Sequence, residues 1–342
     1  MTFMTTAGQA PVPPGAPRGP LGSLLMTPGR WVALAVGVPV ALALIGWTGF
    51  SLITTVAHGS YPFSYEIPVQ NGQVAVNINA GDVTLRQAPG SSAAQLTGTV
   101  QYGLIRPGIG ASLTPTGANV NVSCDGINTD CGMSGTLDVP PQTAVTVWSN
   151  GGNITASGFS SGMSLWAAGG NVTTTDLAGD LQLDTGGGDL TATGLTATGP
   201  HGAIQVDTEG GNVDAGDWVG RGTTRIDTGG GDLSVNGLSG NFQLSTEGGQ
   251  VDASGVASTL VGLDSGGGDV TLDLTQVPQN LQITAEGGNV TVILPLGNTT
   301  YDISTPDNQG ADVAYPQSLS NSNSSNKITI DSGGGNITIS QG

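Results

Sequence analysis

The sequence predicts an all-β fold: a β-solenoid, built as a right-handed parallel β-helix-like stack of about 20 residues per coil and preceded by one transmembrane helix. Three observations predict it. A glycine pair followed by Asp, Asn or Gln and then by Ile, Leu or Val recurs along the chain. The segments around each pair alternate apolar and polar residues, which is the period of a β-strand. Near the N-terminus, one long apolar run carries no charge.

The composition suits a thin core between stacked coils rather than a conventional globular core. Of 342 residues, 58 are glycine, while aromatic residues make up 4% and charged residues 9%. The formal net charge is −18, and every acidic residue lies from Glu66 onward. Such an acidic surface repels nucleic acid and anionic lipid, so both are excluded as partners of that part of the chain.

The N-terminal region predicts a membrane anchor. Residues 1–30 are rich in Pro, Gly and Thr and are expected to form a disordered cytoplasmic tail. Residues 31–56 are uncharged and long enough to cross a ~30 Å hydrocarbon layer as one transmembrane helix. A cleaved signal peptide is disfavoured because its apolar core is only ~7–15 residues long. Arg18 and Arg30 precede the run, so the positive-inside rule places the N-terminus in the cytoplasm and the C-terminal domain outside the plasma membrane.

Residues 60–142 are strand-rich but irregular and are expected to form the first, wider coils and a cap, because a solenoid needs a polar cap at its open end. Cys124 and Cys131 are the only cysteines. Outside the membrane, they are predicted to form a disulfide that closes a short loop. Their spacing is not CxxC and no His cluster accompanies them, which disfavours a zinc site or a redox pair.

Residues 143–342 carry the regular repeats. Each unit, such as LQLDTGGGDLTATGL at Leu181, predicts two strands joined at a glycine corner that requires a positive φ. A dinucleotide-binding loop is excluded, because that motif occurs once and opens a helix. The last interval predicts two coils, one of them degenerate around Tyr301. The glycine pairs begin at Gly151, Gly169, Gly187, Gly210, Gly230, Gly248, Gly267, Gly287 and Gly334.

Outward-facing residues of stacked coils are expected to form two acidic rows. The corners alternate between TGGGD and TEGGN, which is expected to separate like charges on coils about 4.8 Å apart. Oxygen-rich rows suggest Ca²⁺, but solvated acids that keep the stack soluble are favoured, so no metal and no cofactor is predicted. The outer row contains Asp184, Asp207, Asp227, Ser245 and Asp264. The corner row contains Asp189, Asn212, Asp232, Gln250 and Asp269.

Trp148 and Trp166 take the first two places of the outer row. Two stacked outward tryptophans make an apolar patch, which is a candidate recognition surface for a sugar or a protein. The alternative is that residues 60–140 cover the pair. Exposure of the two rings decides between these interpretations.

The ordered series of motifs resembles a known family. It runs from LDVPPQTAVTVWSNGGNITASGF at Leu137, through the repeats, to the closing KITIDSGGGNITISQG. This series is similar to the bacterial "putative adhesin" β-strand-repeat family of unknown function. The resemblance implies a β-helix-like stack on the cell surface, and it implies no catalytic residues.

The function predicted is therefore non-enzymatic: a membrane-anchored extracellular module for surface adhesion or recognition, with a cell-wall glycan or another surface protein as partner. The alternative is a structural or sensory cell-envelope module without a foreign ligand. A polysaccharide-acting β-helix enzyme is disfavoured. Its paired carboxylates would break the repeat at one place, whereas the acidic rows are uniform.

Overall fold

The computed structural model describes residues 59–342 except 104, 116, 124–130, 199–201 and 307–309. Contacts divide the chain into two units, Met1–Val56 and Ala57–Gly342. The predicted tail and transmembrane segment, residues 1–56, lie outside the described residues. Within the described ranges, no helix has the length and apolar character needed to span a bilayer.

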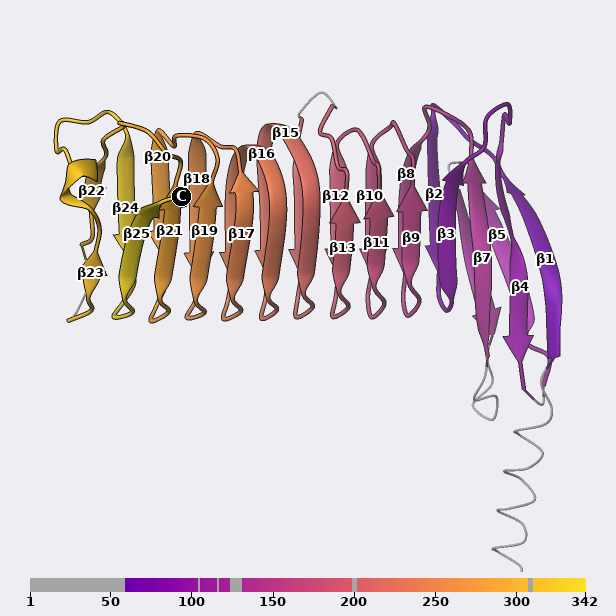
Figure 1. The fold of residues 1–342 in the computed structure, drawn as a ribbon. Coiled ribbons are helices and arrows are strands. Elements are labelled where there is room, and N and C mark those ends of the chain that lie inside the picture. The colour runs from indigo at the N-terminus through magenta and orange to yellow at the C-terminus, as the bar shows by residue number, and fades with distance from the viewer. Residues whose placement is uncertain (1–58, 104, 116, 124–130, 199–201, 307–309) are drawn as a thin grey trace, which may run out of the picture. The chain divides into compact units, whose positions relative to one another are not determined.

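The described chain is all-β, as predicted, with 25 strands in one continuous sheet. Each coil of the central stack contributes two strand segments, and each segment pairs in parallel with its equivalents in the coils before and after it, as Figure 1 shows. β15 and β16 are long strands, and each supplies the second segment of one coil and the first segment of the next. The central strands are β8 (Ala144–Ser149), β9 (Ile154–Ser157), β10 (Met163–Ala167), β11 (Val172–Thr175), β12 (Leu181–Thr185), β13 (Leu190–Thr193), β14 (Ile204–Thr208), β15 (Val213–Thr228), β16 (Leu233–Thr246), β17 (Val251–Val256), β18 (Leu260–Ser265), β19 (Val270–Leu274), β20 (Asn280–Thr284) and β21 (Val290–Leu294).

The core is a set of apolar rows that run through the stack. In β12, Leu181 and Leu183 are buried while the residues between them face outward, as the alternation predicted. A third, short side of the coil adds Leu195 and Trp218, both fully buried. The indole Nε1 of Trp218 donates a hydrogen bond to the Ala192 carbonyl at 2.9 Å. Aliphatic side chains fill most of the narrow interior, which explains why the fold needs few aromatic residues.

At the N-terminal end, the order of coils in the stack departs from the order in the chain. β2 (Gln73–Ile78) and β3 (Asp82–Gln87) pack directly on β8 and β9, and their other sides pair with β6 (Gly117–Ser123) and β7 (Gly132–Val139). Antiparallel strands then end the parallel stack: β5 lies beside β6, β4 lies beside β7, and β1 lies beside β4. These three strands are β1 (Gly59–Ile67), β4 (Ala94–Tyr102) and β5 (Gly108–Thr114).

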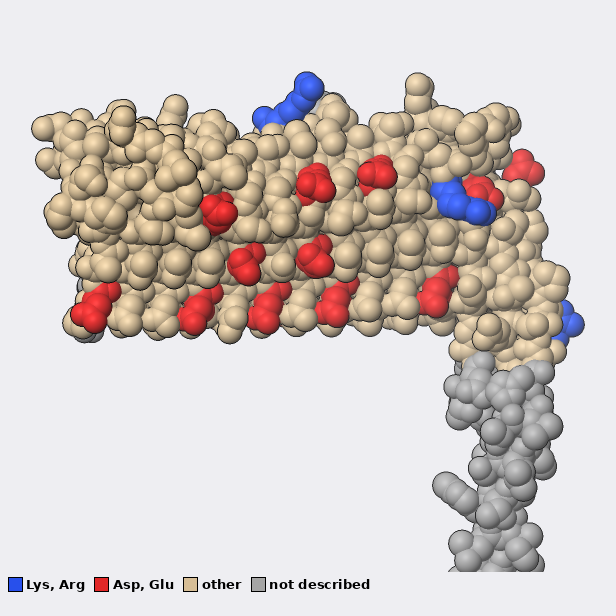
Figure 2. Space-filling model, in the orientation of Figure 1, with Lys and Arg blue, Asp and Glu red and all other residues tan. Residues whose placement is uncertain are grey.

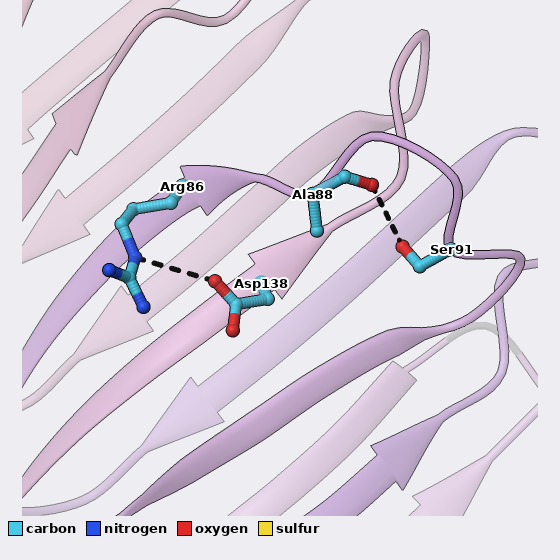
Figure 3. Close-up of polar contacts among 4 residues, drawn as sticks. All are labelled: Arg86, Ala88, Ser91 and Asp138. Carbon is cyan, nitrogen blue, oxygen red and sulfur yellow. Dashed lines mark hydrogen bonds and ion pairs between the residues drawn. The ribbon is translucent and has the colours of Figure 1, made fainter.

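Polar contacts on the surface accompany these N-terminal strands (Figure 3). The Nε of Arg86 in β3 lies 3.4 Å from the Asp138 carboxylate in β7. In the following turn, the Ser91 hydroxyl donates to the Ala88 carbonyl at 3.0 Å. The Arg86 side chain is 59% exposed. The ion pair therefore contributes little stability, and backbone pairing with the buried apolar face holds β3 to β7.

The C-terminal end is also stacked out of chain order. Two coils occupy the interval after β21, as predicted, but the chain first builds the outermost one and then returns to fill the gap beneath it. β24 (Lys327–Asp331) pairs with β20 and with β22 (Asp302–Ser304), and β25 (Ile337–Gln341) pairs with β21 and with β23 (Val313–Ala314). β24 and β25 carry a regular row of buried apolar residues and have a paired strand on each side, while the shorter β22 and β23 each pair with one strand.

Candidate recognition surface

The pairing register assembles the outer row as predicted. Trp148 lies beside Trp166, and Trp166 lies beside Asp184, each on the outward face of its strand. Beyond them the row continues through Asp207, Asp227, Ser245 and Asp264. Asn77 of β2 precedes Trp148 in the same row. The outer row therefore changes from aromatic to acidic between two adjacent coils.

The two tryptophans form an exposed aromatic stack. Their ring centroids are 5.1 Å apart and their planes differ by 9°. Trp148 is 39% exposed and Trp166 is half-buried. The described part of residues 60–140 leaves the pair accessible, so the interpretation in which this region covers it is wrong for Trp148.

A cleft opens between this stack and the neighbouring corners. Its volume is about 290 Å³, and its polar lining comes from Asn150, Asp184 and Glu209. Gly186 forms part of the floor. A Cβ on this glycine would lie 2.4 Å from the Ala168 carbonyl oxygen of the preceding coil, so the fold itself keeps the floor free of a side chain. We refer to this hollow, with its two tryptophans, as the tryptophan cleft.

Negative charge accumulates beside the tryptophan cleft. Partial burial raises the pKa of Asp184 above its ordinary value of 3.8, and the carboxylates of Asp207 and Glu209 raise it further, against a hydrogen bond from the Trp166 side chain. Burial likewise raises the pKa of Asp207, with Asp227 and Glu209 adding to the effect and Arg225 opposing it. The cleft thus combines an apolar wall with several hydrogen-bond acceptors.

Sequence reasoning found Trp148 and Trp166 but missed Asn150 and Glu209. The spacing of the corners along the chain is the signal that could have identified Glu209. Glu209 follows the WAAGGN corner by two coils, and the intervening coil has Gly186 in the equivalent place, so the glutamate borders an open space.

The corner row has a different role from the one predicted. Its carboxylate and amide oxygens are not merely solvated, because most of them accept a hydrogen bond from the backbone N–H of the corner residue in the adjacent coil. Asp189 Oδ1, for example, accepts from the Asn212 N–H at 2.9 Å. The chain of such bonds runs from Asp82 through Asn153, Asn171, Asp189, Asn212 and Asp232 to Gln250, and again from Asp269 through Asn289 and Asn336 to Asp312.

Neutral residues separate the charged residues of the corner row. In stack order, an asparagine or glutamine separates every aspartate from the next. Figure 2 shows the same pattern on the visible face, where acidic residues line the lower edge with uncharged surface between them. The row therefore keeps an acceptor in every coil and avoids stacking two carboxylates, which would repel each other at the coil spacing.

Buried hydroxyls close most corners from the inside. The Thr185 Oγ1 donates to the Gly188 carbonyl at 2.6 Å within the same corner. Ser149, Thr208, Thr228, Thr246, Ser265 and Ser332 make the equivalent bond. Ala167 and Ala285 stand at this position in the other two repeats. The small inward residues predicted to suit a tight bend thus also satisfy a buried carbonyl.

The reason for glycine at the corners also differs from the prediction. The second glycine of each pair lies so close to the adjacent coil that no side chain fits. A Cβ on Gly188 would lie 2.2 Å from the Gly170 carbonyl oxygen, and the same contact recurs at Gly152, Gly170, Gly211, Gly231, Gly249, Gly268, Gly288 and Gly335. A positive φ occurs at the first glycine of only three of the nine pairs, Gly267, Gly287 and Gly334.

The remaining predicted sites are located as follows. Cys131 is half-buried against the core and is not a free thiol, but Cys124 lies outside the described residues, so their pairing stays a prediction. In the described part of the chain, no group of three or more His, Cys, Asp or Glu side chains is arranged to hold a metal ion.

Comparison with known proteins identifies the family. A family model described as Toastrack DUF4097 matches residues 133–340. The chain belongs to this Toastrack family. The match covers the regular repeats and confirms the family resemblance seen in the sequence. No curated protein matches the chain.

Two solved structures resemble this Toastrack chain over much of its length. One is a "putative adhesin" from Parabacteroides distasonis ATCC 8503, with 13% identity and a TM-score of 0.45, covering 83% of this chain and 97% of its own. The other is a "putative cell adhesion protein" from Clostridium sporogenes ATCC 15579, with 12% identity and a TM-score of 0.21, covering 83% and 100%. Both TM-scores are below 0.5, so neither structure enters the functional argument.

Proposed function

We propose that this Toastrack protein is a non-enzymatic recognition module of the bacterial cell surface. In this proposal, residues 31–56 span the plasma membrane once, the N-terminus is cytoplasmic and the solenoid projects outside. The observation that carries the proposal is the exposed Trp148–Trp166 stack beside its acidic cleft.

Exposed tryptophans at these two places serve no evident role in folding. Other described coils put small or polar residues in the outer row, including Asn77, Ser245 and Thr284, and they stack equally well. Tryptophan offers a large, rigid surface for the C–H face of a sugar or for an apolar side chain. Aromatic residues beside a few well-placed polar groups are typical of binding sites, and Asn150, Asp184 and Glu209 supply those groups.

The uniformity of the acidic residues supports a non-enzymatic role. Asp184 and Asp207 are adjacent carboxylates with raised pKa values, which is also a feature of catalytic pairs. Here, however, the shifts come from partial burial and from the carboxylates of neighbouring coils: Asp207 and Glu209 act on Asp184, and Asp227 and Glu209 act on Asp207. Release of new reducing ends from a bound glycan would contradict this part of the proposal.

Binding to the envelope tests the proposal. The full-length chain, purified in a detergent without a sugar headgroup and fixed to beads, is incubated with cell-wall fragments, a glycan panel and intact bacteria. We expect saturable binding that the double variant Trp148→Ala, Trp166→Ala loses at least tenfold. Leu296→Ala is the matched control, because Leu296 is 78% exposed and its loop contributes nothing to the cleft lining. Absence of saturable binding to every probe would contradict recognition and favour a structural or sensory envelope module.

A further inference from the structure

A second row of outward side chains runs beside the outer row, two residues earlier in each strand, and one coil interrupts it. Between β12 and β20 the row is built largely from glutamine, and beyond these strands it continues into Ser164 on one side and Thr329 on the other. From β12 to β20 it contains Gln182, Gln205, Arg225, Gln243, Gly262 and Gln282. Gly262, in the middle of β18, has no side chain. A site is expected to break a repeat at one place, and this is such a place.

The missing side chain leaves a groove along β18. Two adjoining cavities, of about 300 Å³ and 280 Å³, share Gln243, Gly262 and Gln282. One reaches Leu260 and Asn280 at the start of the strand, and the other reaches Asp264 and Thr284 at its end. At the usual strand rise, β18 spans about 17 Å, and the strands on its two sides lie about 9–10 Å apart. We call this hollow the Gly262 groove.

The fold does not require glycine at position 262. A Cβ there would be 3.9 Å from its nearest neighbour, the Phe242 carbonyl oxygen, whereas a Cβ on Gly188 would collide with the adjacent coil. Gly262 has no left-handed φ, and its pairing with both neighbouring strands is regular, without a bulge. Glycine weakens a strand interior and often marks a place where a ligand approaches closely.

We propose that the Gly262 groove binds an extended, neutral oligosaccharide. The backbone of β18 is hydrogen-bonded on both sides, to β16 and to β20, so no free strand edge remains for an extended peptide. What the groove offers is side-chain chemistry: amides, hydroxyls, one carboxylate and one guanidinium, which together match a ligand rich in hydroxyl groups.

Three further features define the ligand. The Arg225 guanidinium lies 3.0 Å from the Asp227 carboxylate, which orients it at the rim of the groove and balances its charge. Leu260, 43% exposed, adds an apolar contact for the C–H face of a sugar ring at the other end. The net charge of −18 disfavours acidic glycans. This site is separate from the tryptophan cleft and does not depend on the proposed function.

Titration with defined sugars tests the groove. Cellohexaose, chitohexaose and mannohexaose are titrated into the full-length chain by calorimetry, in the same sugar-free detergent. We expect at least one to bind. Gly262→Gln, which completes the glutamine row and fills the groove, should lose that binding at least tenfold without lowering the melting temperature. Gln205→Ala, in the same row but outside the groove, is the matched control and should bind like the wild type.

Several outcomes would contradict the proposal that the Gly262 groove binds a sugar. These are failure of all three hexasaccharides to bind, undiminished binding by Gly262→Gln, or displacement of a bound sugar by a Ser/Thr-rich decapeptide. The tryptophan double variant separates this proposal from the previous one. If it abolishes hexasaccharide binding while Gly262→Gln does not, the groove proposal fails and recognition by the tryptophan cleft stands. If both variants keep their sugar binding but the tryptophan variant no longer binds intact bacteria, the groove proposal fails and recognition by the tryptophan cleft stands.

Discussion

The outer row and the corner row look alike in the sequence, yet the structure uses them differently. Both present aspartate, asparagine or other small polar residues once per coil. The corner row turns its side-chain oxygens toward the backbone of the adjacent coil, so each oxygen is part of the hydrogen-bonded stack. The outer row faces solvent, and its carboxylates repel one another. A similar composition therefore stabilises the solenoid at one place and is free for recognition at another.

The largest expected effect is steric and falls on the corner. Gly188→Ala should destabilise the protein by about 3 kcal/mol, because the new Cβ collides with the Gly170 carbonyl and the coils must separate. Thermal unfolding followed by circular dichroism measures the loss. Gly187→Ala is the matched control, since nothing lies within 4 Å of its Cβ position and its backbone is not left-handed. Equal losses for the two variants would refute the close-contact explanation.

The buried hydroxyls should come next. Thr185→Val keeps the shape of the side chain but removes the bond to the Gly188 carbonyl, which is expected to cost about 1–3 kcal/mol. Thr185→Ser keeps the hydroxyl and should lose clearly less. Chemical denaturation gives both values. A valine variant as stable as the wild type would show that the corner closes without this bond.

Substitutions in the corner row are expected to lower stability less, and the loss should depend on whether the new side chain keeps an acceptor oxygen. Asp189→Ala removes the acceptor for the Asn212 N–H and should cost about 1 kcal/mol, because water replaces part of the lost bond. Asp189→Asn keeps an acceptor oxygen and should be close to neutral. Hydrogen exchange at the Asn212 amide is the direct readout, with faster exchange in the alanine variant alone. If both variants behave alike, the charge matters rather than the acceptor.

Substitutions in the outer row are expected to change stability least, and they should raise it rather than lower it. The pKa values of Asp184 and Asp207 are raised in the folded protein, so the folded state holds protons more readily than the unfolded state. Their contribution to stability is therefore present at low pH, near the ordinary value of 3.8, and is lost as pH rises through the raised values. Replacing both with asparagine should stabilise the protein at neutral pH and flatten the fall in melting temperature as the pH rises above the ordinary value of 3.8. A steeper fall in the variant would contradict the assigned cause.

The alternation of apolar and polar residues predicted the central coils because each coil carries the whole pattern within its own residues. The alternation around Leu181 and Leu183 defines a buried face, and matching faces determine the register between coils. The ends were less predictable, because the chain inserts β24 beneath β22 and places β2 beside β8, and strand pairing between distant segments leaves no local pattern.

The candidate site was predicted in the same uneven way. Trp148 and Trp166 stood out because their type departs from that of the other residues in the row. Glu209 borders a hollow because Gly186 in the preceding coil has no side chain, and Gly262 leaves a hollow because it has none itself. Such a hollow can be seen only when the coils are stacked. The hydrogen bond that Asp189 accepts from the next coil cannot be predicted from the sequence either, because the sequence does not distinguish a solvated aspartate from a hydrogen-bonded one.

The most direct measurement compares binding to cell-wall fragments by three forms of the full-length chain: wild type, Trp148→Ala with Trp166→Ala, and Asp189→Asn. If the outer row is the recognition surface and the corner row is structural, the tryptophan variant loses saturable binding while the corner variant keeps the wild-type isotherm. Undiminished binding by the tryptophan variant, or no binding by any form, would contradict this division of roles.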